Sequence, residues 1–306
     1  MLKDFIAIDD FSKNELLDMF RLAADLKAKT KAGVAHHLLA GKTLAMIFQK
    51  PSTRTRVSFE TGMYQLGGHA LYLSPSEIGL GKRESVADVA RVLSRFNDGI
   101  MARLFGHDLI LELAQYASVP VINGLTDFNH PCQVLGDILT IQEKIHRFED
   151  FKITYVGDGN NMVHSWLNAA SRFAFSLHIV CPEGYDPDAK VVESAKAAGI
   201  SDIQIHRDPA EGVQGADFIY TDVWASMGQE AEAEKRKRDF AGFEVNETLV
   251  KATGKTTYVL HCLPAHRGEE ISHEVMEAPY SLVFDEAENR LHMQKAILAT
   301  FMSPIG

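Results

Sequence analysis

Short apolar runs alternate with longer segments of helical periodicity along the whole chain. The runs that predict strands, by their length and bounding residues, lie at 43–48, 69–73, 99–102, 119–122, 153–156, 177–180, 203–205, 218–220 and 258–260. Between them, apolar residues recur three and four positions apart, as in the segment 86–96, which predicts helices. Strands that alternate with helices in this way predict an α/β fold with parallel sheets.

A polar break at 148–150 divides this pattern into two halves. The first half opens with a capping-box sequence, Ser12 to Glu15, ahead of an apolar helical stripe, and ends with a predicted helix to about Arg147. The second half repeats the rhythm of strand and helix. A chain of 306 residues is long enough for two domains of ordinary size. We therefore expect two parallel-sheet α/β domains that meet near residue 148.

Unusual polar residues follow directly after several predicted strands. The segment 52–56 follows the first strand, Arg103 follows the strand at 99–102, and Asp222 follows the strand at 218–220. In open parallel sheets, ligands bind at the carboxyl ends of the strands. We expect these side chains to form binding sites.

Composition and charge narrow the class of protein. The chain is 46% apolar and 24% charged, with a formal net charge of −10 that argues against non-specific nucleic-acid binding. It begins without a signal core or Arg-rich presequence, and no apolar run approaches the ~20 residues that span a membrane. Cys132, Cys181 and Cys262 have neither metal-ligand spacing nor an even disulfide count, which indicates reduced thiols. We expect a cytoplasmic protein that binds neither nucleic acid nor membrane.

The segment Ser52-Thr53-Arg54-Thr55-Arg56 combines the features of an anion site. It lies where a strand ends and a helix starts, so free backbone N–H groups and the helix dipole favour negative charge there. Hydroxyls add donors, and the Arg fork suits phosphate or carboxylate. An ordinary helix cap followed by surface arginines would explain the same residues.

This segment resembles the carbamoyl-phosphate motif of the aspartate/ornithine carbamoyltransferase family. Further segments match that family in the same order along the chain: Arg103 with His130-Pro131-Cys132-Gln133, Asn160-Asn161, Asp222 to Gly228, and His261-Cys262-Leu263-Pro264. The resemblance covers essentially the whole chain. It implies transfer of the carbamoyl group from carbamoyl phosphate to the side-chain amine of L-ornithine, giving L-citrulline and phosphate in arginine metabolism. It implies no metal and no organic cofactor.

The resemblance also implies which residues contact carbamoyl phosphate. These are Ser52, Thr53, Arg54, Thr55, Arg103, His130, Gln133, Leu263 and Arg290. Arg103 corresponds to the Arg that contacts the carbamoyl oxygen and the phosphate, and His130 and Gln133 to the pair that holds the carbamoyl group. Together with Thr55, Arg103 and His130 would place donors where negative charge develops on the carbonyl oxygen. A structural histidine and, for Arg290, a residue on a helix surface are the alternatives.

A second implied set binds the amino acid. It comprises Asn161, Asp222, Ser226, Met227 and Cys262. The segment from Asp222 to Gly228 resembles the loop that binds the ornithine backbone and closes over it, and Asp222 can pair with an ammonium group. Cys262 is expected near the side-chain nitrogen without acting as a nucleophile, because the family's reaction is direct. The implied catalytic residues are therefore Arg103, His130, Asp222 and Cys262.

Two other functions remain open. The segment Gly157 to Met162 suggests a dinucleotide site, although the third glycine of that fingerprint is replaced by Met162 and no acidic residue obviously ends the next strand. A related carbamoyltransferase could use putrescine or acetylornithine, which the segment 222–228 disfavours. The charged segment 230–238 is interpreted as a solvated helix face.

Assembly and domain boundaries follow from the resemblance alone. It implies a homo-oligomer, expected to be a trimer, in which the loop 74–83 reaches the neighbouring subunit's site through Ser76 or Lys82; ordinary surface charges are the alternative. It also implies that the last helix crosses back to the first domain. The expected domains are thus 1–147 plus about 286–306 for carbamoyl phosphate, and 148–285, Rossmann-like, for ornithine.

Overall fold

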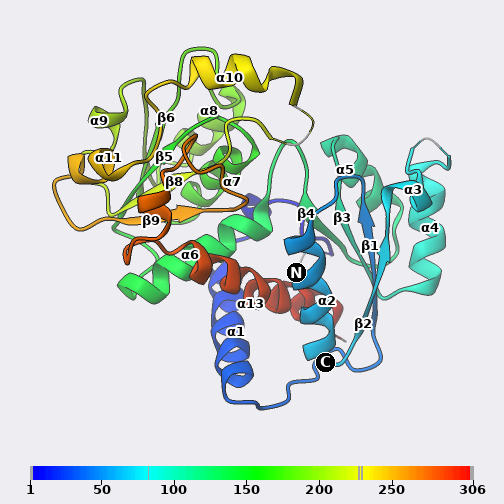
Figure 1. The fold of residues 1–306 in the computed structure, drawn as a ribbon. Helices are drawn as coiled ribbons and strands as arrows, with labels where there is room; N and C mark the ends of the chain where they lie inside the picture. The colour runs from blue at the N-terminus through cyan, green and yellow to red at the C-terminus, as the bar shows by residue number, and fades with distance from the viewer. Residues whose placement is uncertain (1–2, 82, 227, 229, 304–306) are drawn as a thin grey trace. The chain divides into compact units, whose positions relative to one another are not determined.

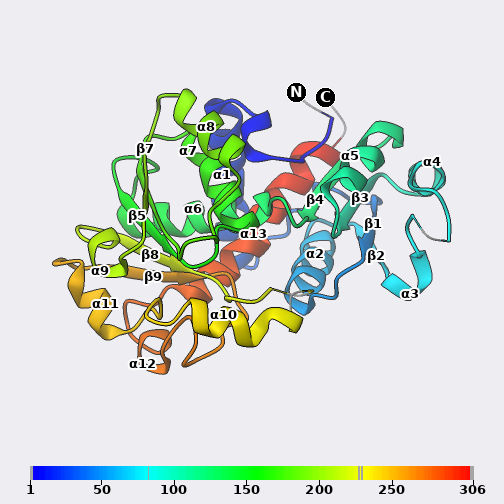
Figure 2. The same cartoon turned by 90° about the horizontal axis from the view of Figure 1, so that it is seen from above.

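The computed structural model describes residues 3–81, 83–226, 228 and 230–303. The chain forms two compact units, which Figures 1 and 2 show in two views. Unit 1 comprises Met1–Gly136 and Asn289–Gly306, and unit 2 comprises Asp137–Glu288. Each unit contains one parallel sheet, which confirms the predicted α/β fold class.

Unit 1 is built on a four-stranded parallel sheet with the order β2-β1-β3-β4. Its strands are β1 (Thr43–Phe48), β2 (His69–Leu73), β3 (Gly99–Arg103) and β4 (Val121–Leu125). Its helices are α1 (Lys13–Lys31), α2 (Thr53–Gln65), α3 (Pro75–Ile78), α4 (Val86–Phe96), α5 (His107–Tyr116), the start of α6 (Pro131–Ile145) and the end of α13 (Val283–Met302), after the short 3₁₀ turn η1 (Ile8–Asp10).

Helices cover both faces of this sheet, with α4 and α5 on one side of the strands and α2 on the other (Figure 2). Alternate residues of β1, Ala45 and Ile47, pack in one apolar cluster with Val89 of α4 and Leu113 of α5. Met46, which points to the opposite face, is buried as well. Because both faces are covered, the strand forms the continuous apolar run that the sequence displays. Burial of a side chain as large as Ile47 or Met46 stabilises the fold by roughly 1.5–3 kcal/mol.

Two predictions for unit 1 need correction. The fourth strand runs from Val121 to Leu125 and not from 119 to 122, because its pairing with β3 begins at Val121, opposite Ile100, and continues to Leu125. The segment predicted as the loop 74–83 contains the short helix α3. Pro75 at its first position and the Ser74–Glu77 capping box stabilise that turn.

Unit 2 is built on a five-stranded parallel sheet with the order β7-β6-β5-β8-β9. Its strands are β5 (Lys152–Val156), β6 (Ser176–Val180), β7 (Asp202–His206), β8 (Phe218–Thr221) and β9 (Tyr258–His261). Its helices include α7 (Asn161–Ala170), α8 (Ala189–Ala197), α9 (Pro209–Gly212), α10 (Ala233–Asp239), α11 (Glu247–Ala252) and α12 (His273–Met276), with the 3₁₀ turn η2 (Glu230–Glu232) before α10.

Aromatic side chains fill the centre of unit 2. Trp166 of α7 meets Phe175 and Tyr220 edge-on, with ring centroids 6.0 and 5.8 Å apart. Tyr220 also stacks on Tyr155 of the neighbouring strand, at 5.7 Å. Such pairs add about 0.5–1.5 kcal/mol each beyond their buried area. The result is a rigid support for the residues that follow β5 and β8.

The strand orders place one topological switch point in each unit. In unit 1 the chain first builds β1, then adds β2 on one side and β3 on the other. In unit 2 it builds β5 first, then β6 on one side and β8 on the other. Ligands bind at the carboxyl ends of the strands at such points. The predicted polar segments follow these strands.

The helix α13 contributes to both units. It begins at Val283, before the predicted start at Asn289, and its residues from Asn289 onward belong to unit 1. Unit 1 therefore consists of two separate stretches of the chain. The division between units falls at Gly136 within α6, whereas the expected boundary lay at 147, because packing rather than the polar break separates the units. Among the described residues, no helix is long and apolar enough to span a membrane.

Candidate active site

The N-terminus of α2 carries the hydroxyls of the predicted anion segment. Ser52 is the N-cap: its Oγ accepts a hydrogen bond from the Thr55 N–H at 3.3 Å and donates to Thr55 Oγ1 at 3.1 Å. Thr53 is exposed, Arg54 is half-buried and Thr55 is buried. The first turn of α2, which the structure describes in full, contains no acidic side chain. The positive end of the helix dipole is thus not neutralised locally.

Two buried guanidinium groups belong to the same unit. Arg290 of α13 donates from Nη2 to Thr55 Oγ1 at 3.1 Å, and Arg103 is the last residue of β3; they are 4% and 7% exposed. Gly136 permits the position of Arg290, because a Cβ at that glycine would lie 3.2 Å from Arg290 Cγ and 3.4 Å from its Cα. Buried charges of one sign require a counter-charge or many hydrogen bonds. The cluster is therefore suited to an anionic ligand.

His130 lies within reach of both guanidinium groups. Burial, together with the charges of Arg290 and Arg103, holds the pKa of His130 well below its usual range. The imidazole is therefore neutral near pH 7, with one N–H donor and one acceptor nitrogen. Gln133 follows in the first turn of α6 and is buried, 1% exposed.

A hydrogen-bonded turn that the sequence analysis missed supports His130. Asn129 accepts from Asn123 Nδ2 at 2.6 Å and donates from its own Nδ2 to the Ile6 carbonyl at 3.2 Å. The Thr126 N–H donates to the Asn129 carbonyl at 2.9 Å. These residues are buried, so the network holds the chain just before His130 in one conformation. An Asn next to the His-Pro pair was the signal available in the sequence.

Lys50 is a second residue that the sequence analysis did not single out. Its ammonium donates to Asp127 and lies 4.4 Å from the ring centroid of Phe105. The Lys50 side chain is 6% exposed, although Asp127 is largely exposed. This contact ties the residue before Pro51 to the segment that leads into His130.

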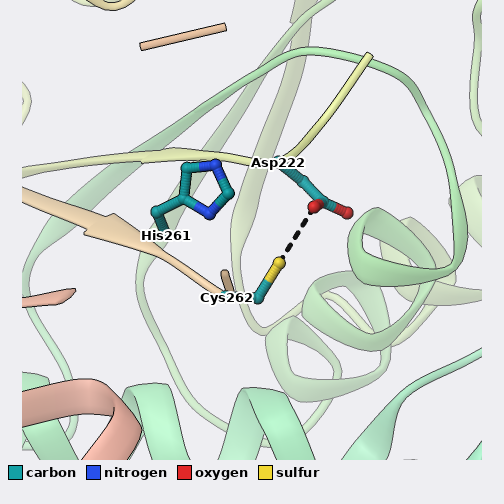
Figure 3. Close-up of side chains that lie close together, drawn as sticks. All are labelled: Asp222, His261 and Cys262. Atoms are coloured by element: carbon teal, nitrogen blue, oxygen red, sulfur yellow. Dashed lines mark hydrogen bonds between the residues drawn. The ribbon is translucent and has the colours of Figure 1, made fainter. Parts of the chain in front are cut away.

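In unit 2, Asp222 is the centre of a hydrogen-bond network at the end of β8. Its Oδ1 accepts from the Val223 N–H at 2.8 Å and from Cys262 Sγ at 3.0 Å, and its Oδ2 accepts from Asn160 Nδ2 at 3.2 Å. Figure 3 shows the thiol pointing at the carboxylate. Asp222 is 7% exposed. The carboxylate is thus fixed beside a thiol at the carboxyl edge of the sheet, which suits an ammonium ligand.

Cys262 carries a protonated thiol at neutral pH. Burial raises the pKa of Cys262 well above 9.0, and the nearby carboxylate of Asp222 raises it further. The thiolate and not the thiol is the nucleophile. The environment therefore suits a positioning contact and disfavours covalent catalysis.

The Asn-Asn segment leads from the end of β5 into α7. Asn160 bonds to Asp222 and also caps α7, its Oδ1 accepting from the Met162 N–H at 2.9 Å and from Tyr155 at 3.3 Å. The expected contact of Asn161 with the amino acid stays a prediction. Asn161 is the first residue of α7 and is half-buried. The N-cap lies outside the helix, so its side chain turns back toward the strand ends.

His261 positions the backbone that carries Cys262 and Leu263. Its Nδ1 accepts from the Leu263 N–H at 2.8 Å, so Nε2 carries the proton and donates to Glu270 Oε1 at 3.0 Å. Leu263 has a φ of 58°, a left-handed conformation that is uncommon for a branched residue. Leu263 belongs to unit 2, so its predicted contact with carbamoyl phosphate stays a prediction.

The segment after β5 is closed to a dinucleotide. A Cβ at Gly159 would lie 2.3 Å from Pro187 N and 2.6 Å from the Tyr185 carbonyl oxygen, so the chain's own backbone occupies the space beside this glycine. The Gly159 N–H also donates to the Tyr185 carbonyl at 2.9 Å. In a dinucleotide fold the glycines leave that space for the pyrophosphate. The geometry therefore disfavours an NAD-binding site here.

Two groups of side chains have metal-ligand spacing within the described part of the chain. The ligand atoms of Asp222, His261 and Cys262 lie within 4.8 Å of one another, as do those of His266, Glu269 and Glu270. In the first group, hydrogen bonds engage both imidazole nitrogens and the thiol, whose bond to Asp222 Figure 3 shows. In the second group, Lys237 lies 2.9 Å from Glu269. Protein partners thus already engage these donor atoms.

The remaining predicted residues lie at or near the gaps in the described chain. Ser226 is described and half-buried, whereas Met227 and Lys82 lie outside the described residues. Ser76 lies in α3, is exposed, and has its Oγ 3.1 Å from Ser74 Oγ. Nothing in unit 1 by itself assigns a ligand to it.

Two family models together match nearly the whole chain. The model of the aspartate/ornithine carbamoyltransferase carbamoyl-P binding domain matches residues 3–143. The model of the Asp/Orn binding domain of the same family matches residues 149–301. The residues around β1 and β3 thus fall in the first model, and those around β5, β8 and β9 in the second.

Individual relatives agree with the family models. The chain is similar to the chloroplastic ornithine carbamoyltransferase of Pisum sativum, with 58% identity over 298 residues, 97% of this chain and 80% of the relative. It is 54% identical to the ornithine carbamoyltransferase of Syntrophotalea carbinolica over 99% of this chain and 100% of the relative. The solved structure of ornithine carbamoyltransferase from Pyrococcus furiosus superimposes with a TM-score of 0.95 at 50% identity, covering 99% of this chain and 98% of that chain. The chain belongs to the aspartate/ornithine carbamoyltransferase family.

Proposed function

We propose that the protein is an ornithine carbamoyltransferase, which transfers the carbamoyl group of carbamoyl phosphate to the side-chain amine of L-ornithine. The products are L-citrulline and phosphate, and the reaction belongs to arginine metabolism. The observation that carries the proposal is a neutral, buried His130 beside the buried guanidinium groups of Arg103 and Arg290. The names of the relatives support the choice of ornithine.

Unit 1 binds carbamoyl phosphate in this proposal. The phosphate takes the N-terminus of α2, where Ser52, Thr53 and Thr55 offer hydroxyls and Arg54 a bidentate fork. The carbamoyl group takes Arg103, His130, Gln133 and Arg290, with Leu263 as an expected further contact. Donors already aligned on the carbonyl oxygen stabilise the negative charge that develops there, because no solvent has to reorganise during the reaction.

Unit 2 binds the amino acid. Asp222, held by Asn160 and Cys262, accepts the ammonium form of the side chain. Asn161, Ser226 and Met227 contact the amino-acid head group. An alkyl ammonium has a pKa near 10.4, so the nitrogen must lose a proton before its lone pair can form the new C–N bond. The C–O bond to phosphate then breaks, and phosphate takes that electron pair. The first proton leaves to solvent, and the second N–H proton, which the nitrogen loses once the C–N bond has formed, passes to the departing phosphate.

The test measures formation of the carbamoylated amine from carbamoyl phosphate with a panel of amines, by mass spectrometry of each product; with ornithine that product is citrulline. L-Ornithine should be turned over with kcat/KM at least a hundredfold above that for putrescine, N-acetylornithine or L-aspartate. The charge of Asp222 and the fit of the head group distinguish these amines. Preference for any amine other than ornithine would refute the substrate assignment and leave the family membership unchanged.

We further propose a homotrimer with shared sites. Val57 and Tyr64, seven residues apart on α2, expose 51% and 80% of their surface, and such exposed apolar side chains support self-association. In this arrangement Ser76 or Lys82 reaches the neighbouring site. An Arg54→Ala chain mixed with a chain whose residues 74–83 are replaced by a Gly/Ser linker should regain citrulline formation. Hybrid trimers that assemble and stay inactive would contradict shared sites.

We also propose a cytoplasmic location. The three cysteines are free in the structure, which supports a reducing compartment. Fractionation with an antibody against the native protein tests this assignment.

A further inference from the structure

The charged segment predicted as a solvated helix face contains one buried arginine. Arg236 of α10 is 7% exposed, while its neighbours Lys235 and Lys237 are exposed. A guanidinium group is costly to bury unless ion pairs and hydrogen bonds compensate it. Two of the groups that compensate Arg236 lie in the segments after β5 and β8, which carry the proposed amino-acid site.

Arg236 Nη1 has two acceptors. It lies 2.7 Å from Asp158 Oδ2 and donates to the Trp224 carbonyl oxygen at 2.9 Å. Arg236 Nε donates to Glu232 at 3.1 Å, and the guanidinium lies 5.1 Å from the ring centroid of Tyr185. One nitrogen thus joins two segments far apart in the sequence.

Both partners lie next to residues of the proposed site. Asp158 follows β5 and precedes the N-cap Asn160 by two residues, and Trp224 lies midway between Asp222 and Ser226. Asn160 donates to Asp222 across the same two segments at 3.2 Å. The bond between Asn160 and Asp222 therefore lies beside the ion pair of Arg236, and the two contacts brace the same pair of segments.

The charge state of Asp158 depends on this contact. Burial raises the pKa of Asp158, and the hydrogen bond and charge of Arg236 oppose that effect. Removal of the guanidinium would leave a buried carboxylate without the ion pair that compensates it, which favours either protonation or movement of the segment after β5.

We propose that Arg236 is a positioning residue for the amine substrate. Arg236 links the segment after β5 to the backbone at Trp224, a link that we call the clasp, and so sets the distance between Asn160 and Asp222. The inference rests on the proposed function for the identity of the amine. Arg236 itself contacts no reacting atom in this role. Its loss should therefore weaken recognition of the amine and leave recognition of carbamoyl phosphate, the ligand of unit 1, nearly unchanged.

The test compares Arg236→Gln and Arg236→Lys with Arg207→Gln. Arg207 is the control: it is more exposed than Arg236, and in the same unit it pairs with Asp186 at 2.6 Å and donates to the Cys181 carbonyl at 3.1 Å. Arg236→Gln should raise the KM for ornithine at least tenfold and change the KM for carbamoyl phosphate less than twofold. Arg236→Lys keeps the charge and should recover part of the loss, whereas Arg207→Gln should change neither constant.

A double substitution separates positioning from simple loss of stability. Asp158→Asn in the Arg236→Gln background removes the uncompensated carboxylate, so the double variant should have a lower ornithine KM than Arg236→Gln alone. Additive effects of the two substitutions would refute the clasp. Should Arg236→Gln fail to fold, Asp158→Asn alone decides: it should raise the ornithine KM several-fold, and an unchanged value would overturn the proposal.

Tryptophan fluorescence supplies a readout that does not need activity. The chain has two tryptophans, and Trp166 is fully buried in α7, so a change in emission reports on Trp224. Folded Arg236→Gln should show a red-shifted emission that Arg207→Gln lacks. An unshifted spectrum together with a normal ornithine KM would overturn the clasp. A wild-type enzyme that ignores ornithine would refute the proposed substrate, and the fluorescence comparison would still decide the clasp.

Discussion

Cys262 offers a direct test of whether the reaction passes through a covalent intermediate. A thiol with the ordinary pKa of 9.0 is about 1% thiolate at pH 7.0, and burial beside Asp222 holds Cys262 below that fraction. Replacement by Ser keeps a donor that can reach Asp222 Oδ1, now 3.0 Å from the sulfur. A hydrogen bond to a charged group contributes about 1.5–3 kcal/mol, but Ser keeps the donor, so only part of that energy is lost, and 1.36 kcal/mol is tenfold. Cys262→Ser should therefore retain at least about a tenth of the wild-type kcat/KM for ornithine.

Two assays check this expectation. Steady-state citrulline formation measures the Cys262→Ser variant against the wild type. Alkylation by iodoacetamide, followed by mass spectrometry of the Cys262 peptide, measures thiol reactivity between pH 7 and 9. Cys262 should react more slowly than glutathione, with a rate that rises up to tenfold per pH unit as the thiol ionises. Cys132, whose pKa burial raises to about 12, is an internal control that should react more slowly than a free thiol as well.

A covalent role would give the opposite results. A carbamoylated Cys262 trapped by acid quench during turnover, or a Cys262→Ser variant slower by a thousandfold or more, would refute the positioning role. Alkylation of Cys262 faster than glutathione at pH 7 would refute the raised pKa on which the reasoning depends.

Three further predictions concern the two proposed sites. Arg54→Ala should lower kcat/KM for carbamoyl phosphate at least a hundredfold, since a charge-assisted contact to the leaving phosphate is lost; near-normal kinetics would contradict the assignment of the α2 site. Asp222→Asn, which keeps the hydrogen-bonding shape, should raise the KM for ornithine at least tenfold while the KM for carbamoyl phosphate stays within twofold, as measured by citrulline formation. The pKa of His130 is lowered in the folded chain, so the unfolded chain takes up a proton below pH 6.5 that the folded chain rejects, and stability is lost on acidification by up to about 1.4 kcal/mol per pH unit. Urea unfolding at pH 7.0 and 5.5 should show a smaller loss for His130→Asn than for the wild type; equal losses would contradict the burial of a neutral imidazole.

The local chemistry of this protein could be predicted from the sequence. The strand at Thr43–Phe48 was predicted at its observed bounds, because a strand covered on both faces has to be apolar throughout. Ser12 caps α1 through the capping box that its spacing to Glu15 predicts. Strand ends followed by hydroxyls, Arg or Asp indicated where ligands bind, since parallel sheets present those ends at one edge.

Contacts between distant segments were decided only by the tertiary structure. Thr55 and Arg290 lie 235 positions apart, and the low pKa of His130 depends on burial and on two guanidinium groups from other elements. Asn160 reaches Asp222, 62 positions away in the chain, from the N-cap of α7. Periodicity describes how one element faces its surroundings and carries no information about which distant charge lies opposite. The sequence pattern therefore predicted Arg236 to be one more solvated charge on a helix face. The structure shows instead that it contacts Asp158 and the Trp224 carbonyl.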